Sequence, residues 1–142
     1  MINYFIEETK FTFNNRRDCT NWIKSVIQEE SYNSPKKVGD ISIIFCSDEY
    51  LLKINKQYLE HDYYTDVITF DNSDDNCVSG DIFISIDTVK SNAEYFKQEF
   101  QSELHRVIIH GILHLLGYND QTKAQSRVMR EREDYYLNKR VS

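Results

Sequence analysis

The sequence predicts an α/β fold of the α+β type, with a single mixed β-sheet of about four strands covered by helices. Short segments rich in β-branched and aromatic residues alternate with longer segments whose apolar residues recur at helical spacing. The 142 residues are 40% hydrophobic, which suffices for one core, and no linker, repeat or low-complexity stretch divides them. We therefore expect one domain over residues 1–142, although the pattern does not indicate strand order or direction.

The amino-terminal part of the chain predicts a strand, a helix and a second strand. Aromatic and aliphatic residues suit an opening strand and turn over residues 2–13. Residues 17–30 should form a helix because their apolar side chains share one face. These side chains are Cys19, Trp22, Ile23, Val26 and Ile27. Pro35 marks a loop over residues 31–37, and the segment 38–46, rich in isoleucine and phenylalanine, is the second strand.

The middle of the chain predicts a capped helix and two further strands. Ser47 precedes a helical segment over residues 49–58 and is a good amino-terminal cap. Residues 66–71 form the third expected strand, and a polar loop follows over residues 72–79. The apolar segment 80–86 is the fourth strand.

The carboxyl-terminal part predicts three helices. Residues 87–96 form a short one, and residues 102–116 form a strongly apolar one that stops at Gly117. Residues 122–139 form the last, and its apolar stripe consists of Ala124, Val128 and Tyr135. These helices should cover the sheet.

Composition and charge narrow the class of protein. No uncharged apolar run approaches the roughly 18 residues of a membrane span. Glu7 and Glu8 lie where a secretory signal would have basic and apolar regions. Three scattered cysteines without a CxxC pair are typical of reduced thiols in the cytosol. We therefore expect a cytoplasmic protein without membrane contact.

The charge distribution leaves open whether the chain binds nucleic acid. A net charge of −6 argues against RNA binding, because phosphate contacts dominate nucleic-acid affinity. Residues 121–142, however, hold more basic side chains than acidic ones. This end of the chain either contacts RNA phosphates or forms a solvated helix face of mixed charge.

The segment HGILHLLGYND, residues 110–120, predicts a metal site. Because successive helical residues turn by about 100°, His110 and His114 lie one turn apart on the same face. Gly117 lets the chain leave the helix through a left-handed conformation, so that Asp120 can reach the same ion. Two imidazoles and a carboxylate, with a fourth position for water, are typical of catalytic zinc. We therefore expect one zinc ion, or another divalent metal, at His110, His114 and Asp120, which act in catalysis through the metal.

The rest of this helix favours a metal site at a cleft. Its remaining apolar residues lie opposite the histidines and can bury the helix. They are Leu104, Ile108, Ile109, Ile112, Leu115 and Leu116. Glu103 shares the histidine face and is a candidate hydrogen-bond acceptor for an imidazole, or else an exposed helix charge. His105 and His61 have no such partners in the sequence, and we expect neither to be a ligand.

Two other interpretations of the histidine pair stay open. Histidines four apart on an apolar helix are often a surface pair or hydrogen-bonded core groups. The same spacing occurs in metalloproteases of the HExxHxxGxxH or HExxHxxGxxD type, which need the glutamate as general base. Gly111 occupies that position here, which disfavours a peptidase of that mechanism.

Three segments together resemble the YbeY-type endoribonucleases of ribosomal RNA maturation. HGILHLLGY, from His110, is similar to the family's metal motif H-G-x-L-H-L-x-G-Y-D-H. INKQYLEHDYYTDVITF, residues 54–70, resembles its LN-x-x-Y-R and T-D-V-L-S-F segment, and GDIFIS, residues 80–85, resembles its GDI-x-I-S strand. The three motifs keep the family's order and spacing.

The resemblance implies a single α/β domain with zinc in a cleft. It implies endonucleolytic processing of ribosomal RNA, notably at the 3′ end of the small-subunit RNA, a role in ribosome quality control, and contact with the small ribosomal subunit. A ribosomal protein could be a further partner. The resemblance also places Thr65 and Asp66 near the cleft, where they orient the metal shell or substrate or only fix the strand entry. Tyr118 could stack on a base or, as aromatic residues more often do, pack against the turn.

Two departures from the family pattern bear on function. Asp120 stands where the family usually has histidine, and a carboxylate is also a zinc ligand. Leu59 stands where the family usually has an arginine credited with a role in activity, and leucine cannot pair with phosphate. The three matching motifs nevertheless favour a metal-dependent endoribonuclease. The alternatives are a metallohydrolase of another substrate, such as a peptide, and a non-catalytic ribosome-assembly factor with a structural metal.

Overall fold

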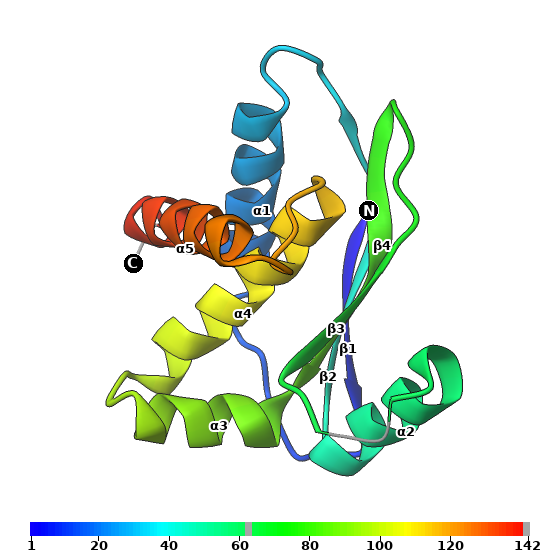
Figure 1. Cartoon of the computed structure of the whole chain (residues 1–142), viewed down its shortest axis with the longest axis vertical. Helices are drawn as coiled ribbons and strands as arrows, with labels where there is room; N and C mark the ends of the chain where they lie inside the picture. The colour runs from blue at the N-terminus through cyan, green and yellow to red at the C-terminus, as the bar shows by residue number, and fades with distance from the viewer. Residues whose placement is uncertain (62–63, 141–142) are drawn as a thin grey trace.

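Four strands of the described residues form one open mixed sheet in the order β1-β2-β4-β3 (Figure 1). The structure is a computed structural model that describes residues 1–61 and 64–140. The strands are β1 (Ile2–Glu7), β2 (Lys37–Cys46), β3 (Val67–Asp71) and β4 (Cys77–Ser85). Strands β1 and β2 pair in parallel, as do β2 and β4, whereas β3 runs antiparallel to β4. The predicted α/β architecture with one mixed sheet is therefore confirmed.

A tight polar turn makes β3 and β4 antiparallel neighbours. Asp74 Oδ1 accepts hydrogen bonds from the backbone N–H groups of Asn76 and Cys77, at 2.7 and 2.8 Å. Because the turn is this short, β4 begins at Cys77, earlier than the strand that we expected over residues 80–86. Parallel neighbours need longer crossover connections, and the helix over Arg16–Glu30 supplies the one between β1 and β2.

The described helices cover both faces of the sheet (Figure 1). They are α1 (Arg16–Glu30), α2 (Asp48–Leu59), α3 (Ile86–Tyr95), α4 (Phe100–Leu115) and α5 (Lys123–Asn138). Helices α1 and α4 pack on one face, where Ile43 of β2 and Ile82 of β4 enter the main core. Helix α2 packs Leu51 against Ile68 on the other face. Within the described part of the chain, no helix is both long and apolar enough to span a bilayer.

Helix α4 is the central element of the core and lies directly on β4. Ten of its sixteen residues are buried. At Gly111 the helix approaches the sheet so closely that an added Cβ would lie 2.8 Å from Ile82 Cγ2. A side chain at position 111 would therefore displace the helix from the sheet.

The opening segment forms the strand and turn that we expected over residues 2–13, and the strand takes up only Ile2–Glu7. Strand β1 ends at Glu7, and Glu8 adopts a left-handed conformation with a φ of 52°. The chain then leaves the sheet edge and folds back over the core. The rings of Phe11 and Phe13 lie 5.1 and 4.8 Å from the ring of Phe45. Phe13 is therefore buried and Phe11 partly buried, so the apolar residues after Glu7 pack on the core from a loop.

Candidate metal centre

The turn after α4 brings Asp120 back towards the two histidines. Gly117 has a φ of +100°, the left-handed conformation that we expected at this glycine. The Tyr118 N–H donates to the Leu113 carbonyl at 3.0 Å, which closes the turn. Ser126 Oγ, in the first turns of α5, then donates to the Asp120 carbonyl at 3.0 Å. The Asp120 backbone is therefore held between two helices.

The three expected ligand residues present their donor atoms to a common point. His110 Nε2 and His114 Nε2 are 3.1 Å apart. Asp120 Oδ2 lies 3.3 Å from His110 Nε2 and 3.7 Å from His114 Nε2. Ligand atoms bound at 2.0–2.1 Å to a tetrahedral zinc are roughly 3.3 Å from one another. The triangle of donor atoms therefore fits a zinc-sized ion, and such an ion would retain an open fourth position.

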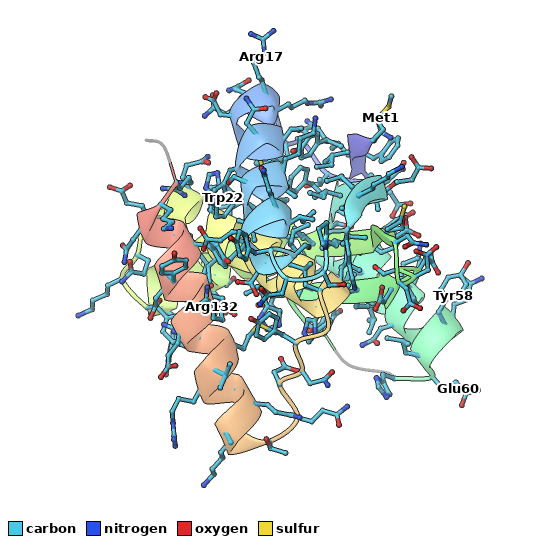
Figure 2. The ribbon with its side chains drawn as sticks, turned by 90° about the horizontal axis from the view of Figure 1, so that it is seen from above. Met1, Arg17, Trp22, Tyr58, Glu60 and Arg132 are labelled. Atoms are coloured by element: carbon cyan, nitrogen blue, oxygen red, sulfur yellow. The ribbon has the colours of Figure 1, made fainter. Side chains whose placement is uncertain are left out.

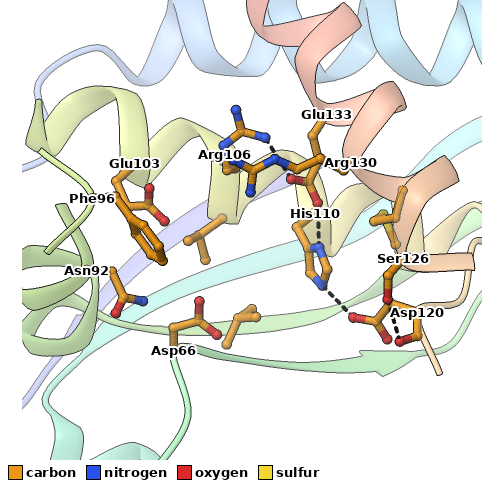
Figure 3. Close-up of a pocket in the computed structure, with 13 residues that line it drawn as sticks. Asp66, Asn92, Phe96, Glu103, Arg106, His110, Asp120, Ser126, Arg130 and Glu133 are labelled. Carbon is orange, nitrogen blue, oxygen red and sulfur yellow. Dashed lines mark hydrogen bonds and ion pairs between the residues drawn. The ribbon is translucent and has the colours of Figure 1, made fainter. Parts of the chain in front are cut away.

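Hydrogen bonds at Nδ1 fix the orientation of both imidazoles. His110 Nδ1 lies 2.7 Å from Glu133 Oε2 and donates to this buried carboxylate (Figure 3). His114 Nδ1 lies 2.9 Å from the Tyr118 carbonyl and donates to it. With the proton on Nδ1, the lone pair of each ring is on Nε2, which faces the triangle. This pairing of histidine with an outer acceptor is usual at metal centres.

Burial and the surrounding charges shift the pKa values of the two histidines in opposite directions. Burial lowers the pKa of His114, and the charge of His110 lowers it further. Burial also disfavours protonated His110, but the hydrogen bond and charge of Glu133, together with Asp120, outweigh burial and raise the pKa of His110. Because metal ions bind neutral imidazole, a proton competes with the metal mainly at His110 as the pH falls.

Arg106 of α4 balances the charge of Glu133. Its guanidinium lies 2.9 Å from Glu133 Oε1 and 2.7 Å from Asp134 Oδ1. Glu133 is therefore paired although it is buried, and its second carboxylate oxygen accepts the hydrogen bond from His110. Arg106 is therefore already paired with two carboxylates.

Two cavities open beside the ligand triangle. The larger, of about 510 Å³, lies between α3, α4 and α5, and His110 and Asp120 line it (Figure 3). The smaller, of about 430 Å³, is lined by both histidines and by Thr65. Asp66 lines both cavities, and burial raises the pKa of its carboxyl group. The candidate metal centre therefore lies where two accessible spaces meet.

The remaining candidate residues differ in what their side chains contact. Glu103 lines the larger cavity, while Glu133 is the carboxylate that contacts His110. The Thr65 hydroxyl donates to the Val67 carbonyl at 3.4 Å, a local contact at the strand entry. Tyr118 contributes its carbonyl to His114 and points its hydroxyl to Glu30 Oε1 at 2.5 Å. The Tyr118 hydroxyl thus ties the turn to α1.

The sequence model of a family described as Endoribonuclease YbeY matches residues 3–140. The chain belongs to the YbeY family. Two proteins named Endoribonuclease YbeY show how close the similarity is. The one from Parabacteroides distasonis is 51% identical over 136 residues, which cover 96% of this chain and 93% of the relative. The one from Phocaeicola vulgatus is 51% identical over 137 residues and 96% of both chains.

A solved structure supports the same fold for this YbeY-family chain. The solution structure of a Thermotoga maritima protein superposes with a TM-score of 0.63 at 29% sequence identity. The match covers 97% of this chain and 87% of the other. The resemblance that we drew from three motifs therefore extends over nearly the whole chain.

Glu133 and Arg106 are site residues that sequence reasoning missed. Glu133 is far from the HGILHLLGYND segment in the sequence, and only the packing of α5 on α4 brings it to His110. The apolar stripe that we expected on the last helix was wrong, because Val128 is 45% exposed. Glu133 lies between Met129 and Tyr136 on the stripe that is buried, where an acidic side chain needs a partner.

We expect Glu133→Gln to weaken metal binding by this YbeY-family protein by roughly 10- to 100-fold, the usual effect of changing an outer acceptor. The variant keeps the shape of the side chain but removes the charge that orients His110. Metal affinity is measured by competition with a chromogenic chelator, and thermal unfolding is measured in parallel. Glu131→Gln, at an exposed position of the same helix, is the matched control. Equal metal affinities in the two folded variants would contradict a positioning role for Glu133.

Proposed function

We propose that this chain is a zinc-dependent endoribonuclease that processes ribosomal RNA in the cytoplasm, including the 3′ end of the small-subunit RNA. In this proposal it works as one domain over residues 1–142, contacts the small ribosomal subunit and contributes to ribosome quality control. The observation that carries the proposal is the donor triangle of His110, His114 and Asp120 in a member of the YbeY family. The relatives' shared name, Endoribonuclease YbeY, supports the reaction class.

The proposed site divides its tasks among a few side chains. His110, His114 and Asp120 hold the ion, and Glu133 and the Tyr118 carbonyl orient the imidazoles. A divalent ion in such a site lowers the pKa of water and stabilises negative charge on a phosphate.

Arg130 supplies the positive charge that the family arginine would provide. Leu59 occupies that family position at the end of α2, and it is not among the described residues that line either cavity. Arg130 of α5 is exposed and lines the larger cavity beside His110. Arg106 is less suited to bind substrate, because Glu133 and Asp134 already pair with it. We therefore assign phosphate binding to Arg130.

The peptidase alternative conflicts with the packing of α4. The general base of an HExxH enzyme would replace Gly111, whose Cα faces Ile82 at a separation too small for a Cβ. A glutamate there would be forced against the buried sheet. A non-catalytic assembly factor, by contrast, would have the same metal centre, so it is separated from the enzyme only by measuring RNA cleavage.

The test combines purified protein with a deletion strain. We expect the protein to contain about one zinc ion per chain, to cut small-subunit precursor RNA, and to lose activity when a chelator removes the ion. The gene should also restore mature 3′ ends in cells that lack their own copy. Zinc content without cleavage or restored ends would instead indicate a non-catalytic factor, and cleavage of casein but not RNA would indicate a peptidase.

A further inference from the structure

The larger cavity extends well beyond the three ligand side chains. Its volume of about 510 Å³ lies within the roughly 300–1,000 Å³ that is typical of small-molecule sites. Figure 3 shows Asn92 and Phe96 across this cavity from Asp120 and Ser126. The space is therefore continuous with the metal centre on one side and bounded by the end of α3 on the other.

Phe96 is an aromatic side chain that the core does not use. It is the carboxyl-terminal cap of α3 and is 58% exposed, although it lines the cavity. The ring of Tyr95 meets the Phe96 ring edge-on, with 5.0 Å between centroids and an angle of 87°. Such a contact restrains the Phe96 ring while leaving ring surface for another partner.

Asn92 adds polar recognition beside this ring. It lies one helical turn before Phe96, and its carbonyl accepts the Phe96 N–H at 2.9 Å. Its half-buried side-chain amide lines the same cavity. An amide offers both hydrogen-bond donors and an acceptor, which match the edge of a nucleobase.

The charged side chains that line the cavity determine where it favours a nucleobase and where it favours a phosphate. The carboxyl groups of Asp66 and Glu103 line its walls, so the interior disfavours a phosphate. A base is neutral, and the amino groups of adenine, guanine and cytosine can donate to these oxygens. The exposed guanidinium of Arg130 lines the same space and suits the phosphate instead.

We propose that this cavity binds a nucleobase adjacent to the scissile phosphate, with the base stacked on Phe96 and its edge facing Asn92. The proposal rests on the proposed function and adds a specific subsite to it. Because every base has a π-face, stacking on Phe96 would tolerate many sequences but would require an unpaired base.

The test uses a short single-stranded RNA with one mapped cleavage site. We expect Phe96→Ala to reduce kcat/KM by roughly 5- to 100-fold, the range found when a stacking aromatic is removed. Phe96→Trp should retain activity. Tyr32→Ala is the matched control, since Tyr32 is 84% exposed and is not among the residues that line this cavity. Circular dichroism and metal content check that each variant is folded and loaded.

Abasic substrates make the assignment specific. An abasic nucleotide beside the cleavage site should slow the wild-type protein at least as much as Phe96→Ala does, and should slow Phe96→Ala much less than it slows the wild-type protein. The subsite would be overturned if the activity losses from Phe96→Ala and from an abasic nucleotide multiplied at every flanking position. A Phe96→Ala variant as active as the wild-type protein would also overturn it.

A non-cleavable RNA, with methylene groups in place of the bridging phosphate oxygens, separates this proposal from the proposed function. If the wild-type protein cuts no RNA but binds this probe more tightly than Phe96→Ala does, the subsite stands and the endoribonuclease assignment fails. If the wild-type protein cuts RNA and both proteins bind the probe equally, the subsite fails alone. If the wild-type protein neither cuts nor binds RNA, both are wrong.

Discussion

Replacing His114 by alanine should release the metal ion and reduce RNA cleavage by more than about 100-fold, the upper range for loss of an outer-shell partner alone. His114 Nε2 is one vertex of the donor triangle, 3.1 Å from His110 Nε2. Without it, only one imidazole and a partly exposed carboxylate remain to hold the ion. Metal content and single-turnover cleavage of a small-subunit precursor RNA measure the effect.

His105→Gln is the matched control for His114→Ala. His105 lies on the same helix and is buried, but its Nδ1 pairs with the Gln101 carbonyl at 2.6 Å and its ring meets Trp22. We expect this variant to keep its metal and its cleavage rate, even if it is less stable. Normal metal content in His114→Ala would exclude His114 from the ligand set, and normal cleavage would mean that the reaction does not use this centre.

The candidate ligands could be predicted because their geometry is local. His110, His114 and Asp120 lie in one eleven-residue segment, so helical periodicity and one left-handed glycine suffice to bring them together. The same reasoning could not reach Glu133 or Phe96. Glu133 depends on how α5 packs on α4, and Phe96 becomes a cavity wall only through the position of α3.

The strands could be predicted individually, but their order could not. Alternation of side chains identifies a strand and its buried face, yet it carries no information about neighbours. Strand β4 lies between β2 and β3 because the polar turn at Asp74 pairs it with β3, while its other edge accepts β2 in parallel. This order places the buried side chains of β4 directly under α4, and that contact positions the metal-binding face.

Of the substitutions that we propose, Phe45→Ala should destabilise the protein most, with a loss of about 3–5 kcal/mol in the free energy of unfolding. Phe45 of β2 is completely buried. Its ring packs against Tyr4, Phe11 and Phe13, at 6.4, 5.1 and 4.8 Å between centroids. A void there removes contacts from three neighbours at once, and domains of this size have only about 5–15 kcal/mol in total.

Urea unfolding of Phe45→Ala should therefore show a much lower midpoint with an unchanged slope. Phe5→Ala is the control, because Phe5 lies on the neighbouring strand β1 but is 46% exposed, and it should cost under about 1 kcal/mol.

Phe11 also meets Phe100 at the start of α4, with 6.1 Å between ring centroids, so this aromatic cluster braces the helix that carries both histidines. Folded Phe45→Ala should nevertheless bind metal normally at low temperature, since the donor triangle lies at the other end of α4. Equal midpoints for the Phe45 and Phe5 variants would show that the cluster does not anchor the core.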